Sequence, residues 1–133
     1  MGAVAAFPDT TREQLEALTA AAESDDSPVV MLNLLRFAGD EGRAAYGRYG
    51  EAVAPLVARV GGEVVWSGSC GDAVIGPQDG EWDWALLVRY PSRRAFLEMI
   101  SSPDYGDAHP HRVAAIADSR LIPCTESSEG ALA

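Results

Sequence analysis

The sequence contains no lysine, and all ten of its basic residues are arginine. Without a lysine amine the protein cannot form a Schiff base with a carbonyl substrate, so this class of covalent catalysis is excluded. Cysteine is equally scarce. Cys70 and Cys124 lie far apart with no cluster of possible ligands around either one. We therefore expect two free thiols rather than a disulfide framework or a zinc site.

Histidine occurs only at positions 109 and 111. A His-x-His pair binds metal when further ligands accompany it, and haem needs an axial ligand, which here would have to be His109 or His111. No further ligand is evident, so we expect no metal. The sequence also lacks a phosphate-binding loop, a dinucleotide fingerprint and a Gly-x-Ser-x-Gly motif. The expectation is therefore a protein without a cofactor.

Long apolar runs are missing too, because no stretch approaches the ~18 residues of a membrane-spanning helix. The N-terminal residues do not combine a basic segment with an apolar one, and we expect a cytoplasmic protein. The formal net charge is -10. Nucleic acids and anionic membranes attract basic surfaces, so the charge argues against both as partners.

What the sequence does have is a regular succession of elements within a single-domain length of 133 residues. The predicted elements are a strand over 29–37, a helix over 42–60, strands over 63–75 and 82–90 joined by a tight turn at 76–80, a short helix capped by Ser92, and a last strand around 120–122. This βαββαβ order predicts an α+β, ferredoxin-like fold whose antiparallel sheet has the strand order 4-1-3-2.

Local signals refine these boundaries. Thr10 and Glu13 have the spacing of a capping box, which predicts an extra N-terminal helix over 10–22. Asp40 is the expected cap of the next helix, and the paired glycines at 61 and 62 should end it. Glycines inside the second strand predict a bulge or a close backbone approach. The domain organisation expected is an N-terminal helical extension (1–27), one core domain (28–125) and a disordered acidic tail (126–133).

Several motifs together resemble a known family. They are the run Met31–Phe37 followed by Tyr46 and Tyr49, the glycine pair before the strand with Trp66, the Tyr90-Pro91-Ser92 corner, and Pro103-Asp104-Tyr105 ahead of Arg112. Over roughly residues 28–124 the chain resembles the dimeric α+β-barrel proteins of the domain-of-unknown-function family thirteen-thirty, DUF1330. The resemblance implies a homodimer that pairs sheet to sheet. The wider superfamily includes cofactor-free oxygenases, isomerases, cyclases and haem enzymes, but the family has no agreed reaction.

Candidate proton-transferring residues are few. Imidazole is the side chain best suited to move protons near neutral pH, so His111 and then His109 are the first candidates, although both fit a rigid turn before a helix as well. Tyr46 is a further candidate. Asp83 lies between two tryptophans, where apolar surroundings could raise its pKa, or it could pair structurally with Arg36 or Arg89.

Polar-tipped and aromatic residues on the predicted inner faces are candidates for ligand binding. They are Asn33, Arg36, Tyr49, Trp66, Trp84, Tyr105 and Arg112. We expect a cavity between the sheet and its helices, with Tyr46, Trp66, Tyr105 and His111 on its wall. Residues 103–112 look too irregular for a covering helix and are predicted to form its lid.

Two functions fit these residues. One is a small cofactor-independent enzyme that oxygenates, isomerises or cyclises an apolar or aromatic metabolite by proton transfer, as in natural-product biosynthesis. The other is a non-catalytic, dimeric small-molecule-binding protein that uses the same cavity. Both require a small-molecule ligand and a homodimer.

Overall fold

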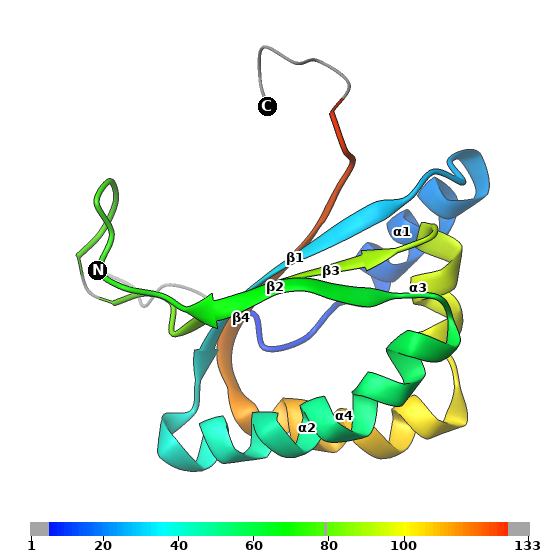
Figure 1. Ribbon diagram of the computed structural model, residues 1–133. Coiled ribbons are helices and arrows are strands. Elements are labelled where there is room, and N and C mark those ends of the chain that lie inside the picture. Colours follow the sequence, from blue (N-terminus) through cyan, green and yellow to red (C-terminus); the bar gives the residue numbers. More distant parts are fainter. Residues whose placement is uncertain (1–5, 79, 128–133) are drawn as a thin grey trace.

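The fold is a single antiparallel sheet with its helices packed against one face (Figure 1). The structure is a computed structural model and describes residues 6–78 and 80–127. The strands are β1 (Val29–Phe37), β2 (Glu63–Ser69), β3 (Trp84–Tyr90) and β4 (Ile116–Cys124), in the order β2-β3-β1-β4. The helices are α1 (Arg12–Ser24), α2 (Gly39–Arg59), α3 (Arg93–Ile100) and α4 (Pro103–Ala115). The predicted ferredoxin-like order of elements and strands is confirmed.

Strand β1 has two apolar faces that meet different surroundings. Val29, Met31 and Leu35 face the helices and are almost completely buried. The alternate residues Val30 and Leu32 point to the other side of the sheet and stay half-exposed. Residues 6–78 and 80–127 therefore place no covering layer on this second apolar face of the sheet (Figure 1).

The core consists of two separate clusters, which lie at opposite ends of α2. The larger cluster gathers Leu56 and Val57 of α2 with residues of β1, β3 and α3. The smaller one joins Ala45 of α2 to Leu35 and to the junction of α4 and β4. There the helix backbones approach closely, since a side chain at Gly42 would meet the Ala115 carbonyl oxygen at 2.6 Å. Helix α2 is thus anchored at both ends and spans the sheet in between.

Two helix starts differ from the predicted ones by one to three residues. The N-cap of α1 is Thr11, whose capping-box partner is Gln14, rather than Thr10 with Glu13. Gln14 can take the place of a glutamate in the capping box, because its side-chain oxygen accepts a hydrogen bond from the Thr11 backbone amide as a carboxylate would. Helix α2 begins at Gly39 without a side-chain cap, so Asp40 lies in its first turn instead of capping it. In the first turn, the negative charge of Asp40 still stabilises the helix by interacting with the positive end of the helix dipole.

The end of α2 follows the prediction. Gly61 has a φ of 83°, which favours glycine. Its amide donates to the Ala58 carbonyl, and the next amide, of Gly62, donates to the Val57 carbonyl at 2.8 Å. This pair of bonds is a Schellman motif, which closes the helix and directs the chain into β2.

The prediction that residues 103–112 form an irregular lid is wrong in secondary structure, because these residues belong to helix α4. Proline at the first position of a helix is favoured, so Pro103 begins α4 rather than only ending α3. The Ser102 hydroxyl accepts from the Tyr105 amide and caps the new helix. Pro110 lies inside the helix, where the packing of α4 along α2 outweighs the lost backbone bond (Figure 1).

The hairpin between β2 and β3 is longer than the predicted tight turn. Strand β2 ends at Ser69, and the connection occupies residues 70–83, of which Asp79 lies outside the described residues. The register shift of β2 lies between Val64 and Trp66, not at the glycines. Cys70 and Cys124 lie at the two opposite edges of the sheet. Most of the predicted tail, residues 128–133, also lies outside the described part, and the domain boundaries at 27 and 125 stay predictions.

Candidate functional site

A large cavity lies between the sheet and the helices, and residues of the larger core cluster form part of its wall. Its volume is ≈ 1360 Å³. Ligand pockets usually measure about 300–1,000 Å³, so the space holds a drug-sized molecule. Much of its wall is apolar and comes from all four strands and all four helices, for example Leu18, Val53, Val64, Leu86 and Leu121. Its location agrees with the prediction from sequence.

Polar side chains of the two adjacent long helices, α2 and α4, gather on the wall of this cavity. Tyr46 and Tyr49 come from α2, and Tyr105, His109 and Arg112 follow one another at helical spacing on α4. The hydroxyls of Tyr49 and Tyr105 are 3.0 Å apart, and their rings meet edge to face. The cavity therefore has a polar end made by two helices and an apolar remainder.

Burial keeps the two tyrosines of α2 in the protonated form. It raises the pKa of Tyr46 to about 12, although the nearby Arg112 guanidinium acts in the opposite direction. It raises the pKa of Tyr49 still further, and the neighbouring Tyr105 adds to the effect. At neutral pH both hydroxyls are hydrogen-bond donors, and neither serves as a base.

His109 lies at the rim of the cavity and is oriented by a carboxylate. Its Nε2 is 3.0 Å from Oδ2 of Asp9, and its ring lies 5.9 Å from that of Tyr105. Because a carboxylate accepts the hydrogen bond, Nε2 carries the proton and Nδ1 keeps its lone pair in the neutral ring. The pair has the arrangement of an imidazole base with an orienting carboxylate.

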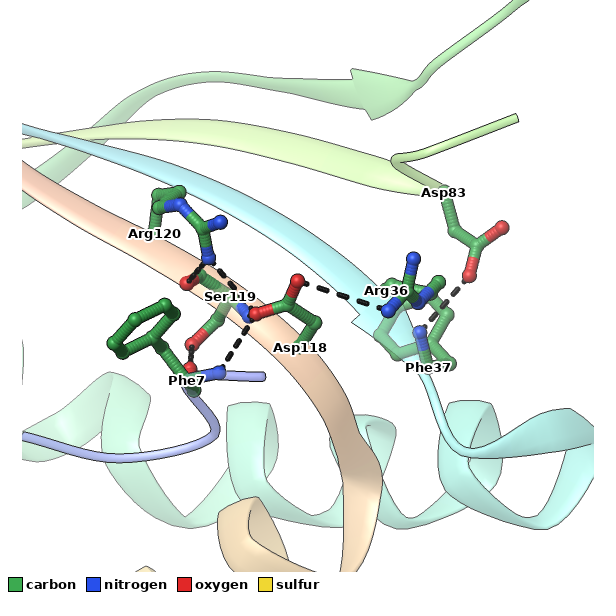
Figure 2. A network of polar contacts seen from close by, with 7 residues as sticks. All are labelled: Phe7, Arg36, Phe37, Asp83, Asp118, Ser119 and Arg120. Atoms are coloured by element: carbon green, nitrogen blue, oxygen red, sulfur yellow. Dashed lines mark hydrogen bonds and ion pairs between the residues drawn. The ribbon is translucent and has the colours of Figure 1, made fainter. Parts of the chain in front are cut away.

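Asp9 belongs to an N-terminal strap (residues 7–10) that runs between the sheet and the helices (Figure 1). The Phe7 amide donates to Oδ1 of Asp118 at 2.8 Å, and the Phe7 carbonyl accepts from the Ser119 hydroxyl at 2.7 Å, as Figure 2 shows. The Pro8 carbonyl accepts from Arg112 at 2.8 Å. The strap is thus tied to β4 and to α4, and it forms part of the cavity wall.

Asp118 is the buried anchor of this strap, with 3% of its surface exposed. Burial alone would raise its pKa, but hydrogen bonds from Phe7, Arg120 and the Ser119 amide outweigh burial and hold the pKa below its usual range. Arg36 lies 3.6 Å from the second carboxylate oxygen. Arg36, a predicted ligand-binding residue, is therefore an ion-pair partner of Asp118 and does not line the cavity.

Asn33 lies on the cavity wall as predicted, with its amide donating to the Met31 carbonyl at 3.2 Å. Asp83 lies elsewhere. Its Oδ2 accepts from the Phe37 amide at 2.9 Å, and its own amide donates to the Leu35 carbonyl. Asp83 therefore holds the end of β1 (Figure 2), in place of the expected arginine pair, and it is not part of the cavity wall.

Three further predicted residues are absent from the cavity wall. Trp66 pairs with Leu87, so the bulge before it turns its side chain to the uncovered face, where it is 53% exposed. Trp84 packs against the smaller core cluster, with the Arg43 guanidinium 5.6 Å from its ring. His111 lies two residues beyond His109 in α4 and so points away from the face that His109 shares with Tyr105.

Asp9 and Phe7 are site residues that sequence reasoning missed. Both precede the predicted N-terminal helix, in a segment treated as an addition to the core. Their partners lie about a hundred residues later in the chain, and no periodicity or motif in the sequence signals such a contact.

The described residues show no metal centre and no membrane helix. Among residues 6–78 and 80–127, no three histidine, cysteine, aspartate or glutamate side chains come close enough together to hold a metal ion. No helix in these ranges has the length and apolar character needed to cross a bilayer.

Comparison with known proteins shows which family this fold and site belong to. Residues 41–123 match the family model described as Domain of unknown function (DUF1330). The chain belongs to the DUF1330 family. A solved relative, a protein of unknown function from Rhodopseudomonas palustris, is 39% identical, with a TM-score of 0.85 and with 93% of this chain and 99% of that chain covered. No curated protein matches.

More distant structures share the fold of this DUF1330 protein. A dimeric ferredoxin-like protein of unknown function from Jannaschia sp. CCS1 is 12% identical, with a TM-score of 0.57, 75% of this chain and 100% of that chain covered. The hydroxynitrile lyase from Passiflora edulis is 11% identical, with a TM-score of 0.60, 78% of this chain and 97% of that chain covered. At such identities the likeness shows the fold alone, and the function must be argued from the cavity.

Proposed function

We propose that this DUF1330 protein is a cofactor-independent enzyme that binds an apolar or aromatic metabolite in the cavity and transfers a proton on it. One observation carries the proposal: a row of hydroxyl, imidazole and guanidinium groups lines one end of an otherwise largely apolar cavity. An apolar space with a few convergent polar groups is the usual form of a small-molecule site.

His109 is the proposed base, because Asp9 holds its ring with Nδ1 unprotonated. In the proposed step, Nδ1 takes a proton from a carbon next to a substrate carbonyl. The electron pair of the broken C–H bond moves into an enolate, and the protonated imidazole returns the proton to another carbon or to the oxygen. The outcome is an isomerisation, or a cyclisation when the enolate attacks within the molecule.

The enolate oxygen needs hydrogen-bond donors, and the adjacent helices α2 and α4 supply them. Tyr46 is protonated and lies within electrostatic reach of Arg112. A hydroxyl and a guanidinium aimed at one oxygen stabilise the negative charge that develops in the transition state. The Tyr49–Tyr105 pair, at 3.0 Å, has a proton to spare beyond the one shared between its oxygens.

We further propose that the active form is a homodimer joined through the uncovered sheet face. An apolar row crosses all four strands there: Trp66 pairs with Leu87, Leu87 with Leu32, and Leu32 with Ile122. Trp66 and Ile122 are 53% and 43% exposed. A contiguous apolar surface of this kind is typical of protein interfaces, and the Jannaschia structure is described as dimeric.

Deuterium exchange tests the catalytic proposal. The protein is incubated in D₂O with a panel of apolar and aromatic ketones and enolisable lactones, and incorporation at carbon is followed by NMR. His109→Ala should lower the exchange rate by about 10²–10⁴-fold. His111→Ala is the matched control, the same change two residues away and off the cavity wall, and should exchange like wild type.

The possible results separate the two functions considered. Binding of panel members without exchange would overturn the enzyme and leave a non-catalytic binding protein. Equal loss in both histidine variants would show that the base is not His109. A panel that neither binds nor exchanges would contradict the cavity as a metabolite site.

A further inference from the structure

We infer that the ligand of this cavity carries one negative charge, a carboxylate or a similar anion, bound by Arg112 at the polar end. The inference rests on the proposed function, since it names the chemical class of molecule that the cavity takes. It goes beyond proton transfer, because it concerns a group of the ligand that need not react; when that group occupies Arg112 and Tyr46, the Tyr49–Tyr105 pair supplies the donor for the enolate oxygen.

Among the residues that the structure describes, Arg112 is the arginine of the cavity wall that lacks an acidic partner. Arg59, Arg93 and Arg120 each lie within 3.4 Å of an aspartate oxygen. In the part of the chain that the structure describes, no carboxylate oxygen lies within 4.0 Å of the Arg112 guanidinium. Its guanidinium therefore forms no ion pair with a described residue, although it lies on the wall of a mostly apolar cavity.

The carboxylate on the neighbouring strap does not fill this role. Asp9 uses Oδ2 for His109 and Oδ1 for the Thr10 amide, at 3.0 and 2.8 Å. The strap offers Arg112 the uncharged carbonyl of Pro8 instead, bound through Nη1 at 2.8 Å. A guanidinium has five N–H donors, so one such bond leaves donors free for a ligand.

The surroundings favour an anion at this point. A cation beside apolar walls attracts an anion more strongly than a cation in open water does, because the local dielectric is lower. The planar guanidinium matches the two oxygens of a carboxylate. Tyr46, kept protonated by burial, can donate to the same group. With a net charge of -10 the whole chain repels anions, so selection for an anion must come from this local cation.

The wall away from Arg112 determines the chemical character of the rest of the ligand. Away from Arg112 the cavity wall is largely aliphatic and aromatic, with Leu18, Val53, Leu86 and Phe96 among its residues. Such a wall fits a hydrocarbon or ring system. The class is therefore an apolar acid, with an anionic head at α4 and an apolar body directed toward the larger core cluster.

A pair of fluorescent probes that share a ring system tests the charge. Anilinonaphthalene sulfonate is anionic, and N-phenylnaphthylamine is its uncharged counterpart. Arg112→Gln should weaken binding of the sulfonate by about tenfold to a hundredfold, the worth of a hydrogen bond to a charged group. The affinity for the neutral probe should change by less than about twofold in the same variant. Arg112→Lys, which keeps the charge, should retain most of the preference for the sulfonate.

Arg59→Gln is the matched control, because Arg59 is a surface residue paired with Asp104, outside the cavity wall. It should leave both affinities unchanged. In wild type, an aromatic carboxylic acid should displace the sulfonate at least about tenfold better than its methyl ester. If Arg112→Gln weakens both probes equally, or if acid and ester compete equally, the anion site is refuted while the cavity stands. If neither probe binds wild type, the proposed function itself fails.

Discussion

Gly50 offers the sharpest test of the cavity, because a side chain there enters open space. It lies in α2, one turn after Tyr46, and lines the cavity. A Cβ built on it meets nothing within 4 Å. Gly50→Leu therefore places an isobutyl group in the space where the ligand is proposed to bind, without displacing any protein atom near the Cβ.

The expected effects on stability and on binding have opposite signs. Leucine in a helix interior is more favourable than glycine by about 0.5–1 kcal/mol. For a domain of this size the melting temperature should rise by about 2–5 °C. Ligand binding should weaken, because forcing extra methylenes into an occupied space costs about 1–3 kcal/mol, or about fivefold to a hundredfold in affinity.

Gly47→Leu is the matched control. Gly47 is exposed in the same helix, also meets nothing within 4 Å, and is not part of the cavity wall. Thermal melts should show a similar rise in melting temperature for both variants. Titration with N-phenylnaphthylamine should show weaker binding only for Gly50→Leu. Equal affinity in the two variants would refute the location of the ligand. A lower melting temperature for Gly50→Leu alone would refute the open space beside α2.

Two further predictions concern the dimer and the strap. Leu32→Glu, in the middle of the apolar row, should convert a dimer to a monomer in light scattering, because each large apolar side chain gains about 1.5–3 kcal/mol from burial; a wild-type monomer at micromolar concentration would disprove the interface. Asp118→Asn should lower the free energy of unfolding by about 1–2 kcal/mol at neutral pH through weaker bonds to Phe7 and Arg120. Because the pKa of Asp118 is lowered in the folded state, this stabilisation is present above its unfolded pKa of about 3.9 and is lost as the pH falls through the folded value. Denaturation curves of the two proteins should therefore converge in acid, and a constant difference across pH would contradict the assignment.

The sequence was sufficient for the fold because the fold rests on short-range patterns. The apolar run at 29–37, the Ser92 cap and the glycine pair after α2 each act within a few residues, and their order allows few topologies. The two prolines of α4, in contrast, made this helix unpredictable from the sequence. Proline breaks a helix from inside but starts one from its first position, and only packing along α2 decides which applies to Pro103 and Pro110.

The site was predictable only where it follows helical periodicity. Tyr46, Tyr49 and Tyr105 lie on the cavity wall because each faces inward from a helix. Trp66 does not, since a single inserted residue in β2 reverses every later side chain of the strand. The sequence also favours His111, whereas His109 is the histidine on the cavity wall. The orientation of each histidine depends on α4 being a helix, and the prolines at 103 and 110 obscure that helix in the sequence.

The strap has a consequence for how the molecule is made. Its hydrogen bonds join residues separated by 100 to 112 positions in the chain. During synthesis, residues 7–10 leave the ribosome about a hundred residues before their partners on α4 and β4. Contacts of such long sequence separation form late, after their loop-closure entropy has been offset by other structure. The sheet and helices should therefore assemble around an open cavity, and the carboxylate that orients His109 should arrive as one of the last events of folding.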